Sequence, residues 1–284
     1  MGAYQFQRIP LPALSPSAPR SLAFDEGTHT LWSVNNPPSA TGKFVWHFDL
    51  HGNLLSSWPA APQSQNLDGI AVDTAGQRVF YFQNLGRYVQ EARMDGTWVS
   101  TTQLPVGYQN NTYSLDYDPV TGQIVMPYTG TSAGPRGFLH MSPDTHSILF
   151  TEPYDLSGVS SLIYDFYLSQ DAYWLLGASG SISTLVHVDR SSLRIEETFD
   201  IPGISPSNAV GLSRDSETGL FYVLNRSGMI EVFQVPEPSG YSLLVMGVIV
   251  LTCSRARPSK ASSMSGSSER SNAAFGCFSD EDGT

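Results

Sequence analysis

A five-residue phrase that recurs five times constrains the fold of this chain more than any other feature. Its first position is Ser or Gly, its second is Leu or Ile, and its fifth is always Asp. The aspartates lie 48, 45, 47 and 50 residues apart, and periods of this length are typical of repeat architectures. The copies are Ser21–Asp25, Gly69–Asp73, Ser114–Asp118, Ser161–Asp165 and Gly211–Asp215.

Each copy opens a unit in which four short strands are predicted. The apolar runs are rich in β-branched and aromatic residues and are bounded by turn residues, a pattern typical of strands. In four units the second run begins six residues after the Asp, whereas in the fourth unit it begins about two residues later, at Tyr173. Four strands in a unit of this length make one blade of a β-propeller.

The two ends of the repeat region complete one blade between them. The fifth unit stops after its third strand, at Val235, and the N-terminal stretch from Tyr4 to Pro10 has the pattern of an outer strand. Pairing these segments would close the ring and remove two free sheet edges. We therefore predict an all-β fold, a five-bladed propeller over residues 1–235 closed by the N-terminal strand. A six-bladed ring that is truncated at its start is the alternative.

The phrase also resembles the innermost strand of known propeller repeats. The segment Asn66-Leu67-Asp68-Gly69-Ile70-Ala71-Val72-Asp73 is similar to the Pro-x-Gly-Ile-Ala-Val-Asp pattern of NHL- and YVTN-like propellers. The resemblance covers roughly residues 15–235. It implies a propeller but no particular ligand.

The composition changes abruptly after Val235. Pro236, Glu237 and Pro238 precede an apolar run over 241–251, and Arg255 and Arg257 follow it. This order resembles a PEP-CTERM sorting signal over residues 236–257. The resemblance implies an exported protein that is held in the bacterial inner membrane through residues 241–252 until an exosortase-type processing enzyme cuts it.

Two features of this segment depart from the family. The apolar run is shorter than the roughly 20 residues that span a bilayer as a helix, and the chain continues past Arg257 to Thr284. A short apolar helix that packs on the propeller is the alternative. Residues 258–284 are rich in Ser and end in acidic residues, which predicts a disordered tail.

Export requires a signal peptide, and Met1–Arg20 lacks the basic start and apolar run of one. We therefore expect a signal peptide upstream of Met1. The two cysteines, Cys253 and Cys277, lie beyond the repeats, so the blades are predicted to form without disulfides.

Charge and motifs exclude several functions. The net charge is -11, and an acidic surface repels phosphate backbones, so no nucleic-acid partner is expected. The six histidines show no metal-binding spacing, and nucleotide or serine-hydrolase motifs are absent. We expect no metal and no cofactor. The five tryptophans are expected to pack in the core.

Candidate ligand-binding residues come from the innermost strands, which line the channel of a propeller. Asp116 is the one ionisable residue at the middle position of the phrase. Arg20, Asp68 and Tyr113 directly precede their copies, so these four are predicted to form a channel cluster. The five terminal aspartates are predicted to form tight turns, because an Asp at the start of a turn accepts backbone N–H bonds.

The sequence thus favours a non-enzymatic, surface-associated propeller that binds extracellular polysaccharide or protein. A lactonase- or glycosidase-like hydrolase that uses Asp68 and Asp116 is the alternative, because glycosidases work with pairs of carboxyl groups.

Overall fold

The computed structural model describes most of the repeat region, and the contacts of the chain fall into two units, Met1–Pro236 and Glu237–Thr284. The described residues are 3–12, 19–35, 42–61, 67–83, 88–105, 114–129, 136–154, 165–179 and 181–235. All of them belong to the first unit. The predicted sorting signal and tail lie outside the described residues. Within the described part of the chain, no helix has the length and apolar character needed to cross a membrane.

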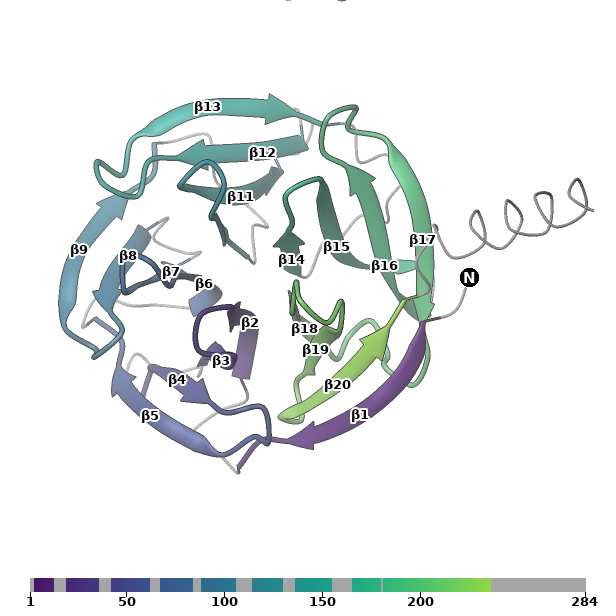
Figure 1. Ribbon diagram of the computed structural model, residues 1–284. Helices are drawn as coiled ribbons and strands as arrows, with labels where there is room; N and C mark the ends of the chain where they lie inside the picture. The colour runs from purple at the N-terminus through teal and green to yellow at the C-terminus, as the bar shows by residue number, and fades with distance from the viewer. Residues whose placement is uncertain are drawn as a thin grey trace, which may run out of the picture. The chain divides into compact units, whose positions relative to one another are not determined.

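The first unit is a five-bladed β-propeller, as predicted (Figure 1). Every blade is a four-stranded antiparallel sheet, and the strands of blades 1 to 4 follow one another from the centre outwards. Blade 1 contains β2 (Pro19–Asp25), β3 (Thr30–Asn35), β4 (Phe44–Phe48) and β5 (Leu54–Pro59); blade 2 contains β6 (Leu67–Asp73), β7 (Arg78–Gln83), β8 (Tyr88–Arg93) and β9 (Trp98–Gln103). Blade 3 contains β10 (Asp116–Asp118), β11 (Gln123–Thr129), β12 (Arg136–Met141) and β13 (Ile148–Pro153); blade 4 contains β14 (Asp165–Leu168), β15 (Ala172–Ser179), β16 (Ile182–Asp189) and β17 (Ile195–Ile201). Blade 5 contains β18 (Ala209–Arg214), β19 (Phe221–Asn225), β20 (Met229–Gln234) and the N-terminal strand β1 (Tyr4–Pro10).

The N-terminal strand closes the ring. Strand β1 pairs antiparallel with β20, from Tyr4 opposite Gln234 to Pro10 opposite Met229 (Figure 1). Arg8 adds an ion pair of 2.8 Å with the buried Glu231. The ring therefore closes at five blades, and the fifth blade joins the two ends of the repeat region.

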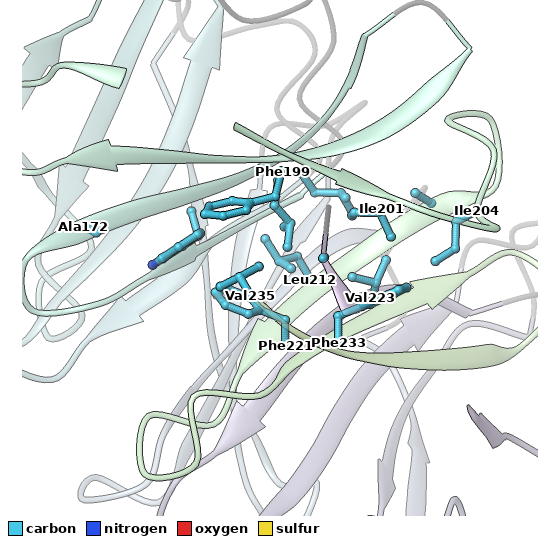
Figure 2. Close-up of a cluster of buried hydrophobic side chains, with 14 residues drawn as sticks. Ala172, Phe199, Ile201, Ile204, Leu212, Phe221, Val223, Phe233 and Val235 are labelled. Carbon is cyan, nitrogen blue, oxygen red and sulfur yellow. The ribbon is translucent and has the colours of Figure 1, made fainter. Parts of the chain in front are cut away.

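Apolar side chains fill the spaces between neighbouring blades. The cluster between blades 4 and 5 packs Phe199 and Ile201 of β17 against Leu212, Phe221 and Phe233 of blade 5 (Figure 2). Burial of apolar surface stabilises a fold by roughly 25 cal/mol per Å². Because each blade shares such a cluster with its neighbours, this burial holds the blades in the ring.

Four of the five recurring aspartates form turns, as predicted. The carboxylate of Asp25 accepts bonds from the N–H of Gly27 (3.1 Å) and the hydroxyl of Thr28 (2.7 Å). Asp118 bonds in the same way to Val120 and Thr121. The other two turn-forming residues are Asp73 and Asp215.

The prediction was wrong for Asp165. In blade 4, Trp174 of β15 stacks on His187, as Trp32 of blade 1 stacks on His47. When blades 1 and 4 are aligned on these stacked pairs, Tyr167 corresponds to Ala23. Asp165 therefore occupies the first position of the phrase, and Ser169, four residues later, occupies the turn position. The turn is also two residues shorter, since Ser169 N bonds to Ala172 O whereas Asp25 pairs with Thr30. The two changes partly offset each other, so the spacing to Tyr173 exceeds that of the other units by only two residues.

Candidate functional site

The inner strands crowd at the first position of the phrase, which is Ser or Gly in four blades and Asp165 in blade 4. A Cβ atom on Gly69 would lie 2.9 Å from backbone atoms of Ser114 and Leu115, and one on Gly211 would lie 3.0 Å from Leu22 N. Real Cβ atoms essentially never lie within 3.0 Å of other atoms, so Gly69 requires glycine, and at Gly211 a Cβ would fit only if its neighbours moved. This close-packed layer, here called the axial layer, contains Ser21, Gly69, Ser114, Asp165 and Gly211.

The carboxylate of Asp165 bonds to four of the five blades within the axial layer. It accepts bonds from the N–H groups of Leu22 (3.3 Å), Leu212 (2.9 Å) and its own neighbour Phe166 (2.9 Å). The hydroxyls of Ser21 (3.1 Å) and Ser114 also donate to it. Asp165 is fully buried, and a buried carboxyl without such donors would cost several kcal/mol.

Ser21 extends this network to the remaining blade. Its hydroxyl accepts a bond from Ile70 N at 3.3 Å in blade 2 while it donates to Asp165. Its backbone has a φ of 47°, in the left-handed region that favours glycine and costs a serine about 1 kcal/mol or more. Burial raises the pKa of Asp165 well above its usual range, and the bonds from Leu212, Phe166 and Ser21 oppose this shift. The axial layer is thus a polar core held together by one carboxyl group.

A pocket of about 480 Å³ lies on one side of the axial layer, and all five blades line it. Its walls come from the ends of the inner strands and from the turns that follow them, so we call it the axial pocket. Its apolar and aromatic side chains include Phe24, Val72, Tyr117, Tyr167 and Leu168. Its acidic side chains are Glu26, Asp73 and Asp116.

Asp116 is the most perturbed carboxyl group of the axial pocket. Burial raises its pKa to about 7, and the bonds it accepts from Leu168 N and Tyr117 N act against this shift. The negative charges of Asp118 and Glu26 raise the pKa of Asp116 further. Each of its oxygens accepts one backbone bond, at 2.8 Å from Tyr117 and 2.7 Å from Leu168. A carboxylate can accept about four, so this group retains the capacity to bind a ligand.

Glu26 is the second perturbed acid. Its Oε1 accepts a bond from Ser216 N at 3.0 Å, whereas its buried Oε2 has no hydrogen-bond partner. Burial raises the pKa of this carboxyl, and the Ser216 backbone bond opposes the shift. Tyr167 lies at the middle position of the phrase, and burial together with the charges of Asp116 and Glu26 raises its pKa.

Positive charge is scarce in the axial pocket. Asp73 is paired with Arg78 at 2.7 Å, but among the residues that the structure describes, those that line the pocket include no Lys, Arg or His. Asp116 and Glu26 therefore face the pocket without a cation in its described lining. The pocket combines aromatic walls with a surplus of negative charge.

The sequence-predicted candidates do not form one cluster. Arg20 and Asp68 lie 3.5 Å apart, just before the axial layer along β2 and β6, and burial lowers the pKa of the nearby Lys43 while Asp68 opposes this shift. Asp116 lies on the other side of the axial layer, in the axial pocket. Tyr113 is outside the described residues. Whether these residues bind a ligand stays a prediction.

The roles of Asp165, Glu26 and Tyr167 were not predicted from the sequence. The false alignment of the fourth phrase assigned Asp165 to a turn and put Ile163 where Tyr167 stands in the structure. The irregular spacing before Tyr173 was the signal that could have revealed the shift. Glu26 gave no signal, because it follows a turn-forming Asp in only one unit.

Two histidines of the third strands, His47 of β4 and His187 of β16, stack on tryptophans of their own blades. His47 stacks on Trp32 with ring centroids 3.9 Å apart, and His187 stacks on Trp174 at 4.4 Å. Within the described residues, no three His, Cys, Asp or Glu side chains form a group that could hold a metal ion. Four tryptophans are buried, but Trp98 is 55% exposed because it begins an outer strand with one face in solvent.

Comparisons with known proteins show the fold. No protein-family model and no curated protein sequence matches this chain. Among solved structures, the glutaminyl cyclase of Myxococcus xanthus matches with a TM-score of 0.60 and 14% identity, covering 83% of this chain and 97% of the cyclase chain. The nidogen/laminin complex matches with a TM-score of 0.48, 15% identity and 78% and 81% coverage. Hydrazine synthase of Kuenenia stuttgartiensis matches with a TM-score of 0.46 and 10% identity, covering 75% of this chain and 56% of the synthase chain.

Proposed function

We propose that this chain is an exported, surface-associated propeller whose axial pocket binds extracellular polysaccharide. The observation that supports this most is the pocket itself, to which every blade contributes. Aromatic side chains such as Tyr117 and Tyr167 can stack on sugar rings, while Asp116 and Glu26 can accept bonds from hydroxyl groups. Concave sites with apolar walls and a few polar groups are the usual form of ligand sites.

The proposed cellular location rests on the sequence. Pro236-Glu237-Pro238, the apolar run and the arginines Arg255 and Arg257 resemble a sorting signal. In this proposal an exosortase-type enzyme processes the C-terminal segment after the inner membrane has held it through residues 241–252. The propeller would then stand at the cell surface, where polysaccharide is available.

Binding is tested by titrating the whole chain with oligosaccharides released from the surface polysaccharide of the producing cell. We expect saturable binding that Asp116→Asn weakens at least tenfold, because the substitution removes a charged acceptor from the pocket floor. Asp95→Asn removes the same charge from an exposed turn in blade 2 and should leave the affinity unchanged. Equal affinities in all three proteins would contradict binding in the axial pocket.

The cellular location is tested separately by cell fractionation. A chain carrying an added export leader is compared with a copy in which Pro236, Glu237 and Pro238 are replaced by alanine. We expect the altered copy to stay in the membrane fraction, while the parent chain is released or attached to the surface. The same distribution for both would contradict the sorting signal and leave the binding proposal standing.

A hydrolase remains the second candidate, supported by the pKa of Asp116 near 7. A general acid or base works best when its pKa lies near the operating pH, and the structural neighbour glutaminyl cyclase shows that this fold accommodates an enzyme. The pair of Asp68 and Asp116 loses its support, because the axial layer separates the two. Turnover of the bound oligosaccharide that disappears in Asp116→Asn would favour the hydrolase.

A further inference from the structure

The charges around the axial pocket indicate the charge of the ligand that it would bind. Asp116 and Glu26 contribute carboxyl groups, while the described residues that line the pocket include no cationic side chain. Arg78 pairs with Asp73, and Arg190 pairs with Asp118. Arg214 lies near Tyr167 but stacks over the rings of Trp174 and Phe221, and His29 lies near Glu26 and 3.9 Å from Glu217. A neutral ligand would leave the carboxyl groups of Asp116 and Glu26 without a cation in direct contact. A cationic ligand would supply one.

The unpartnered oxygen of Glu26 also favours a ligand that donates hydrogen bonds. The Oε2 atom is buried and accepts no hydrogen bond, although buried polar atoms in proteins are nearly always bonded. A donor group in the pocket could satisfy this acceptor after a small side-chain movement. An ammonium group carries three such donors.

The walls of the pocket fit an organic cation better than a metal ion. Phe24, Tyr117 and Tyr167 present aromatic rings at the pocket, and aromatic faces attract ammonium groups by about 0.5–2 kcal/mol each. Calcium and magnesium instead prefer six or more oxygen ligands, and the described residues hold no group of three metal-ligating side chains. The apolar surface would contact the carbon skeleton of the ligand.

We propose that the ligand of the axial pocket carries a protonated amine, bound between the carboxylates of Asp116 and Glu26 and the aromatic walls. This proposal rests on the proposed binding function and deepens it, because it names the chemical group that is recognised. Amino sugars with a free amine are one source of such a group, and the amino terminus of a peptide is another. Acetylated or neutral sugars lack it.

Calorimetric titration of the full chain with matched probes tests this inference. Glucosamine is compared with N-acetylglucosamine and glucose, which keep the ring but lose the charge, and with alanine amide, which carries the amine without a sugar. We expect glucosamine or alanine amide to bind at least tenfold more tightly than both neutral sugars. The tighter of the two identifies the source of the amine.

Variants show whether the binding belongs to the axial pocket. Asp116→Asn and Glu26→Gln should each weaken binding of the preferred amine at least tenfold. Glu217→Gln removes one charge from an exposed side chain that follows Ser216 on the same face, and it should change the affinity less than twofold. Equal weakening by Glu217→Gln would overturn the proposal in favour of general attraction to an acidic surface.

A probe with a permanent charge supplies a second readout. Choline does not titrate, so its affinity should follow the ionisation of Asp116 and rise about tenfold between pH 6 and pH 8, given a pKa near 7. The rise should vanish in Asp116→Asn. If neutral sugars bind as tightly as glucosamine, and Asp116→Asn weakens their binding, the proposal that the ligand carries an amine is contradicted. The proposed binding function would then still stand. If no probe binds while the released oligosaccharides do, the amine is again excluded. If those oligosaccharides also do not bind, the proposed binding function is contradicted together with the amine.

Discussion

At the scale of single residues, two carboxyl groups of the inner strands have opposite roles. Asp165 is fully buried in the axial layer, and five donors surround its oxygens. Asp116 lines the axial pocket and accepts one backbone bond at each oxygen. The first group is saturated and holds blades together, while the second retains acceptor capacity for a ligand.

Replacement of Asp165 by alanine should destabilise the propeller strongly. The substitution leaves the N–H groups of Leu22 and Leu212 and the hydroxyl of Ser114 buried without an acceptor, which costs about 3–5 kcal/mol for a broken buried network. Urea denaturation of the variant measures the loss. Asp95→Asn, in an exposed turn, should cost less than about 1 kcal/mol. A loss for Asp165→Ala as small as that of the control would contradict the assigned role.

Asp116 should make stability depend on pH in a defined window. Its pKa is raised from 3.8 to about 7 in the folded protein, so between these values the folded state binds the proton more tightly than the unfolded state. Stability from this group is therefore greatest at low pH and is lost as the pH rises towards 7. Asp116→Asn removes the effect, so the free energy of unfolding of the variant, relative to the parent, should increase from pH 4 to pH 8. A constant difference across this range would mean that Asp116 has an ordinary pKa.

At the scale of elements, the sequence predicted the strands well and their exceptions poorly. Apolar runs rich in β-branched and aromatic residues, and turn-forming aspartates such as Asp25 and Asp118, reflect local chemistry that recurs from unit to unit. The shift at Asp165 depends on contacts across the axis with Ser21 and Leu212, which no local pattern reports. The axial pocket was hidden for the same reason, because it unites residues from five separate units.

Strand β1 should be essential for a closed ring. Ile9 of β1 and the flanking residues Ala3 and Leu11 belong to the apolar clusters on both sides of blade 5, and the backbone of β1 pairs along the whole of β20. Deleting residues 1–11 should expose that edge, lower the Tm by more than about 10 °C and promote association between chains. Circular dichroism and light scattering measure both effects.

A matched variant separates the strand from its ion pair. Arg8→Ala removes the contact of an exposed arginine with Glu231 and should cost only about 1 kcal/mol. A synthetic peptide covering residues 3–12 should restore part of the Tm of the deleted chain. A deletion no more harmful than Arg8→Ala would show that the ring does not need its N-terminal strand.

At the scale of the whole molecule, the propeller is complete within the first unit. All five sheets and all five apolar clusters consist of residues from 3 to 235. A chain that ends after Pro236 should therefore keep the circular dichroism spectrum and a Tm within about 3 °C of the parent, because it retains every described strand and apolar cluster of the blades. It should also keep the affinity of the axial pocket for its ligand, since the described residues that line the pocket all precede Pro236. A Tm lowered by 10 °C or more would instead support the alternative in which residues 241–251 form a helix packed on the propeller, since only a segment with a buried apolar contact could contribute so much.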